Sequence, residues 1–116
     1  MNTSPIAALT AAAALLAATG AQAHAHLVKA APGEKAVVAA PRSIHLEFSE
    51  KLEPKFSGVE LVKANGAPVP VTTKAAGKTI DAAPKTALGP GEYRVLWRVL
   101  SADGHKMKGQ YSFTVK

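Results

Sequence analysis

Three histidines and one aspartate are the residues of this chain best suited to hold a metal ion. His24 and His26 are separated by one alanine and directly follow an apolar leader. Much further along the chain, Asp103 and His105 flank a single glycine. Imidazole and carboxylate groups are nitrogen and oxygen donors, which suit Cu(II) first and Ni(II) next.

The leader matters because its removal would give His24 a second metal-binding group. Residues 6–18 are almost entirely Ala, Leu and Ile, a run too short to span a membrane but typical of a signal peptide. A small-residue cleavage site follows, so we expect a signal peptide of residues 1–23 and a mature domain of residues 24–116. His24 would then offer its free α-amine and its imidazole Nδ1 to one ion. A second such site two residues later would make His26 the first residue instead.

The composition restricts both the cellular compartment and the metal ion that we expect. The chain has no cysteine and two methionines, of which one is Met1. Disulfides and thiolate ligands are therefore excluded, and the soft donors that Cu(I) prefers are scarce. Cu(II) heads the affinity order of the divalent ions. We therefore predict a periplasmic protein that binds one Cu(II) per chain.

The net charge of +6 comes from lysines and arginines scattered along the mature segment. A basic face could favour an anionic partner such as a membrane surface, but we interpret the charge as a contribution to solubility. There is no basic stripe with interleaved aromatic residues, so we expect no nucleic-acid partner. We expect a monomer.

The mature segment predicts an all-β domain. Apolar and polar residues alternate over 44–48, 93–99 and 110–115, which is the period of strands with one buried face. Pro68 and Pro70 place their segment at a sheet edge or in a loop. About seven short strands with frequent turns indicate an immunoglobulin-like β-sandwich or a Greek-key β-barrel.

The same alternation assigns two further residues. Trp97 shares its face with the apolar residues of its strand, so we expect a core side chain rather than a neighbour of the metal. His45 alternates with the apolar residues of its strand, so we expect a surface histidine that does not bind metal.

Several short segments of the mature chain together carry a family resemblance. They are His24-Ala25-His26-Leu27-Val28, Pro32-Gly33, Leu46-Glu47-Phe48-Ser49-Glu50, Phe56-Ser57-Gly58, Pro90-Gly91-Glu92-Tyr93-Arg94-Val95-Leu96-Trp97-Arg98-Val99, Ser101-Ala102-Asp103-Gly104-His105 and Lys108-Gly109-Gln110-Tyr111-Ser112-Phe113-Thr114-Val115. In this order they resemble the CopC family of periplasmic copper-binding proteins, and within it the YobA-like members.

The resemblance implies a cupredoxin-like Greek-key fold that binds copper in copper resistance, homeostasis or delivery. Its Cu(II) ligands would be His24, through amine and imidazole, with Asp103 and His105. Relatives with a Cu(I) site use a methionine-rich loop, whereas the matching residues 61–74 contain no methionine. A CopD-like inner-membrane copper transporter is the implied protein partner, as a separate chain.

Three alternatives to a non-catalytic Cu(II) carrier remain open. The first keeps copper but binds it through the amine of His24, two backbone amides and the imidazole of His26, without Asp103 or His105. The second is a copper-dependent oxidase or monooxygenase that uses the chelate at His24. The third is a structural or adhesion domain without a metal, in which the loop at 101–105 is only a turn.

Overall fold

The structure, a computed structural model, describes residues 26–116, and these form nine strands and one short 3-10 helix, η1 (Pro54–Phe56). The strands are β1 (Leu27–Ala31), β2 (Val37–Val38), β3 (Ile44–Phe48), β4 (Gly58–Lys63), β5 (Pro68–Val69), β6 (Val71–Ala76), β7 (Thr79–Pro84), β8 (Gly91–Leu100) and β9 (Lys106–Val115). The predicted all-β class is confirmed. The strand count exceeds the expected seven because β2 and β5 are two-residue strands.

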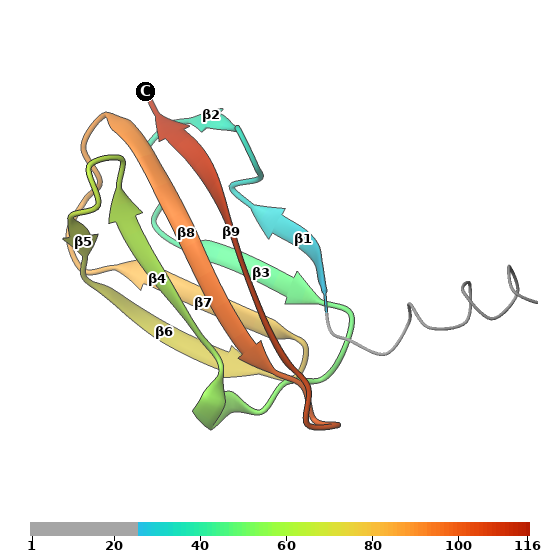
Figure 1. Ribbon diagram of the computed structural model, residues 1–116. Helices are drawn as coiled ribbons and strands as arrows, with labels where there is room; N and C mark the ends of the chain where they lie inside the picture. The colour runs from blue at the N-terminus through green and yellow to red at the C-terminus, as the bar shows by residue number, and fades with distance from the viewer. Residues whose placement is uncertain (1–25) are drawn as a thin grey trace, which may run out of the picture.

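The strands form two sheets that pack face to face (Figure 1). One sheet has the order β1-β3-β7-β6 and the other β2-β9-β8-β4-β5. Pro70 lies between β5 and β6, which are edge strands of different sheets, so the predicted edge position of this segment is confirmed. In residues 26–116, no helix has the length and apolar character needed to cross a membrane.

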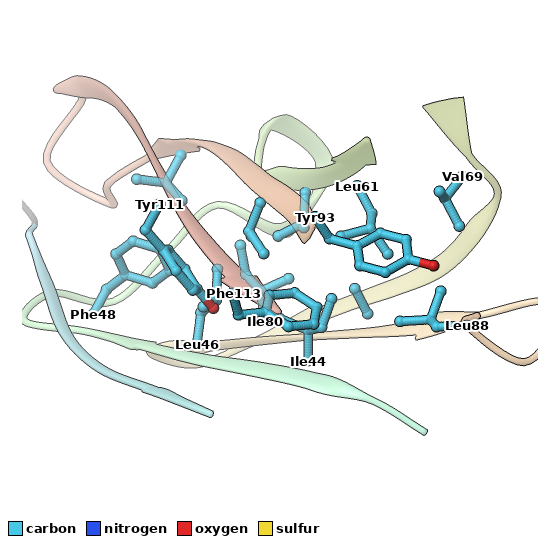
Figure 2. Packing of buried hydrophobic residues seen from close by; sticks show 14 of the residues in the cluster. Ile44, Leu46, Phe48, Leu61, Val69, Ile80, Leu88, Tyr93, Tyr111 and Phe113 are labelled. Atoms are coloured by element: carbon cyan, nitrogen blue, oxygen red, sulfur yellow. The ribbon is translucent and has the colours of Figure 1, made fainter. Parts of the chain in front are cut away.

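The core fills the space between the two sheets, as Figure 2 shows. Its buried members alternate along each strand with residues that face outward, as the period of two requires. They are Ile44, Leu46, Phe48, Leu52, Val59, Leu61, Val69, Ile80, Ala82, Leu88, Tyr93, Val95, Val99, Tyr111, Phe113 and Val115. The inward faces predicted for the strands over 93–99 and 110–115 are therefore confirmed.

Trp97 is partly buried and packs against the core, as expected. Its ring packs against that of Phe48 in a T-shaped arrangement, with centroids 5.1 Å apart. The ring also covers Gly109, its partner residue across β8 and β9. A Cβ atom at Gly109 would lie 2.4 Å from Cζ2 of Trp97, so this position has no room for a side chain.

His45 lies on the outward face of β3, as expected, but it has a defined partner. Its Nδ1 lies 2.7 Å from Oδ1 of Asp81, the residue opposite it on β7. The sequence did not reveal this cross-strand pair, because Asp81 is 36 residues away along the chain.

The contact between Trp97 and Gly109 predicts the stability of two glycine variants. Gly109→Ala should lower the free energy of unfolding by about 1–3 kcal/mol, since the new methyl group must displace the indole. Chemical unfolding followed by circular dichroism measures this change. Gly58→Ala is the matched control, because a Cβ there meets nothing within 4 Å, and it should leave stability unchanged or raise it by up to about 1 kcal/mol. Equal effects of the two substitutions would contradict the steric explanation.

Candidate metal centre

The loop that carries Asp103 and His105 closes the longest hairpin of the domain. β8 and β9 pair over ten positions, ending with Leu100 opposite Lys106. Two backbone bonds then tighten the loop: Ser101 N–H donates to the His105 carbonyl at 2.9 Å, and Gly104 N–H donates to the Ser101 carbonyl at 2.9 Å. Gly104 has a φ of 95°, a left-handed conformation that glycine adopts without steric cost.

This turn brings the side chains of Asp103 and His105 together. Oδ1 of Asp103 lies 3.0 Å from Nδ1 of His105. The two side chains are 52% and 43% exposed, so an ion could approach from solvent, although Nδ1 itself is buried. The predicted pairing of these two residues is therefore present in the fold.

The spacing of the two donor atoms fits metal binding. Two ligands at right angles on an ion, each bonded at about 2.0–2.1 Å, lie about 2.9 Å apart. Oδ1 of Asp103 and Nδ1 of His105 have nearly this separation. Since Nδ1 of His105 is buried, an ion could reach both atoms only if the His105 imidazole moved outward.

Ser101, to which the sequence motifs assign no role, makes side-chain hydrogen bonds to both Asp103 and His105. Its hydroxyl donates a short hydrogen bond to Oδ1 of Asp103 and accepts one from the His105 N–H at 3.2 Å. The hydrogen bond from Ser101 and, second, the hydrogen bond from the His105 side chain lower the pKa of the Asp103 carboxyl from 3.8 to about 2. The carboxylate is therefore ionised, the form that binds a metal, at all physiological pH values.

A second segment, residues 49–53, connects this loop to the start of β1. At one end, Ser49 exchanges two bonds with His26: the Ser49 N–H donates to the His26 carbonyl at 2.9 Å, and the His26 N–H donates to the Ser49 hydroxyl at 3.0 Å. Two positions later, the Lys51 carbonyl accepts from Ala102 N–H at 2.8 Å. Leu52 then forms an isolated bridge with Ser101. The beginning of the described chain and the Asp103 loop therefore border the same short segment.

Of the other histidines, His26 and His45 are described by the structure, and neither joins the pair. His24 lies outside the described residues, and its role as a ligand stays a prediction. His26 is exposed. His45 is bound to Asp81 on a sheet face. In residues 26–116, no group of three or more His, Cys, Asp or Glu side chains is placed to hold a metal, so Asp103 and His105 need further donors from elsewhere.

Comparison with known proteins shows that the chain is similar to copper resistance proteins. Residues 27–116 match the model of the CopC domain. The chain is similar to copper resistance protein C of Xanthomonas campestris pv. juglandis, with 45% identity over 90% of this chain and 89% of the relative. It is also similar to protein YobA of Escherichia coli K12, with 41% identity over 81% and 80% of the two chains. Among solved structures, PcoC of Escherichia coli, described as a methionine-rich copper resistance protein, has a TM-score of 0.75 and 40% identity over 81% of this chain and 100% of its own.

The bonds around Asp103 predict how its carboxyl titrates in metal-free protein of residues 24–116. Because the pKa falls below the usual 3.8, ionised Asp103 stabilises the fold above about pH 4, and this contribution is lost as the pH falls towards 2. Carboxyl 13C shifts measured by NMR should therefore give a midpoint of about 2 for Asp103. In urea the same carboxyl should return to its usual value. A folded-state midpoint at 3.8 would contradict the hydrogen bonds described.

Proposed function

The chain belongs to the CopC family, and we propose that its mature form binds one Cu(II) ion in copper resistance, homeostasis or delivery. The observation that carries this proposal is the pair of donor atoms on Asp103 and His105, which lie 3.0 Å apart on a loop ordered by hydrogen bonds. Their nitrogen and oxygen chemistry favours Cu(II) over the thiophilic Cu(I).

His24 would complete the ligand set. Asp103 and His105 supply two donors, and the α-amine and imidazole of His24 would add two more, which makes four donors for a tetragonal ion. The amine becomes available only if the signal peptide of residues 1–23 is removed. Cleavage after Ala23 is therefore part of the proposal.

The pairing around residues 49–53 supports the approach of His24 to the loop. β1 runs antiparallel to β3, and His26 is bonded to Ser49, so the preceding residues would extend in the direction of Lys51. Two residues span at most about 7 Å, which sets the reach of His24 from His26. Lys51 is already bonded to Ala102, the neighbour of Asp103.

The small number of sulfur-containing residues argues against a methionine-rich Cu(I) site. The solved relative PcoC is described as methionine-rich, whereas this chain has two methionines, Met1 and Met107. Met107 is partly buried and packs against the core. We infer that this protein handles copper in its oxidised state.

The biological setting follows from the proposed export. We infer a periplasmic monomer that carries or sequesters copper without catalysing a reaction. A CopD-like inner-membrane copper transporter would be a separate protein that receives the ion. These inferences rest on the leader and on the family, whereas Cu(II) titration tests the site itself.

Blocking the amine of His24 is the direct test of the chelate. Protein that begins at His24 should bind one Cu(II) tightly, and the same protein with one alanine added before His24 should bind at least tenfold more weakly, because the amine becomes an amide. Titration against a competing chelator, followed by visible absorption, measures both affinities. His26→Ala in protein beginning at His24 is the control and should bind as tightly as the unmodified chain. Equal affinity with and without the added alanine would refute the chelate.

Removing His105 separates the proposed ligand set from binding by the terminus alone. His105→Ala and Asp103→Ala should each weaken Cu(II) binding by about 10-fold or more and shift the EPR spectrum, since each removes one equatorial donor. His45→Ala, which removes a histidine engaged with Asp81, should change neither quantity. If His105→Ala binds normally while His26→Ala does not, copper is held by the terminus and its amides instead.

A further inference from the structure

We propose that Ser101 is a positioning residue that fixes Asp103 and His105 in the geometry needed for copper. This inference rests on the proposed Cu(II) function of the same loop. Ser101 is 1% exposed and is the one polar residue among the buried side chains of residues 26–116. A buried hydroxyl is costly unless its hydrogen-bonding capacity is used, so the use of this one is informative.

The hydroxyl has one proton and several oxygen neighbours. Its two possible acceptors are Oδ1 of Asp103 and the carbonyl of His105, the latter at 3.2 Å. The carboxylate is the stronger acceptor because it is ionised. The His105 carbonyl is in any case satisfied by the Ser101 N–H at 2.9 Å. We therefore assign the hydroxyl proton to Asp103.

The same hydroxyl oxygen also accepts a hydrogen bond from the backbone of His105. The His105 N–H points to the Ser101 hydroxyl at 3.2 Å and to Oδ1 of Asp103 at 3.4 Å. Ser101 Oγ, Asp103 Oδ1 and the His105 amide thus form a closed triangle at the base of the loop. The triangle fixes both the rotation of the Asp103 carboxylate and the backbone from which the imidazole projects.

The fold itself does not require this hydroxyl. The backbone of Ser101 makes its own bonds, to the His105 carbonyl and from the Gly104 N–H, and it bridges Leu52. An alanine could make all of these, and its methyl group suits a buried position better than an unpaired hydroxyl. What alanine would lose is the contact with Asp103 and with the His105 amide, both of which belong to the proposed copper loop.

Hydrogen bonds to ligating carboxylates commonly change metal affinity by about 10- to 100-fold when they are removed. Ser101→Ala should therefore weaken Cu(II) binding by about tenfold or more. The EPR spectrum of the bound Cu(II) should also change, because the carboxylate can rotate about its side-chain bonds. The metal-free protein should remain folded by circular dichroism, although it loses the stabilisation that the Ser101 bond gives to ionised Asp103.

Ser57→Ala is the matched control. Ser57 has a partly buried hydroxyl that accepts a hydrogen bond from the N–H of Leu100 at 3.1 Å, one residue before Ser101. The substitution removes a partly buried hydroxyl from the same end of the sandwich but leaves the contacts of Asp103 and His105 intact. Its Cu(II) affinity and EPR spectrum should match those of the unmodified protein. All variants should start at His24 and be titrated with Cu(II) against the same competing chelator.

The outcomes distinguish this inference from the proposed function. If His105→Ala does not weaken binding, the proposed site is wrong whatever Ser101→Ala does. If His105→Ala weakens binding but Ser101→Ala behaves like Ser57→Ala in affinity and EPR, the positioning role of Ser101 is wrong. Ser101→Thr keeps the hydroxyl and should restore the EPR spectrum of the unmodified protein. A Ser101→Thr spectrum equal to that of Ser101→Ala, in a protein that remains folded by circular dichroism, would also overturn the role.

Discussion

β8 and β9 each direct alternate residues into the core, and this allows only one register between them. A slip by one position would move the buried face of one strand to solvent, at the cost of most of the core on that side. The register in turn sets where the hairpin closes, with Leu100 opposite Lys106 and five residues left for the loop. The position of Asp103 and His105 is therefore a consequence of hydrophobic packing many residues away. The hairpin also places Gly109 opposite Trp97, so the indole can lie over the strand there.

The segment of residues 49–53 links this hairpin to the start of the first strand through backbone hydrogen bonds. At its start, just after β3, the segment is hydrogen-bonded to His26. Further along, the Lys51 carbonyl accepts a hydrogen bond from the Ala102 N–H, and the Glu53 N–H donates one to the Leu100 carbonyl. Its backbone satisfies groups on both sides, so neither the first strand nor the hairpin loop can move far without breaking bonds to it. One half of the proposed ligand set is thus built into the sandwich, and the other half would be tethered next to it.

Sequence patterns were sufficient for the fold and for the proximity of Asp103 to His105, because both depend on local information. Alternation over residues 44–48 and 93–99 follows directly from the strand period, and Asp-x-His is visible as a motif. The role of Ser101 was not predictable in the same way. Serine at the end of a strand is usually a surface residue, and its burial here depends on Leu52, far away in sequence. The partnership of His45 with Asp81 was hidden for the same reason, since it depends on the pairing of β3 with β7.

The division of the site between a built loop and a chain terminus has a chemical consequence. A free α-amine does not exist before cleavage, so the uncleaved chain would lack one of the four proposed donors and could not chelate the ion through the amine and imidazole of His24. The added amine would tighten Cu(II) binding, because each further ligand on an ordered site replaces a water without a further loss of translational freedom. A protein arranged in this way would acquire high affinity only after removal of its leader. The buried hydroxyl of Ser101 suits this arrangement, since it keeps the loop ready for an ion while the loop still lacks the partner that completes it.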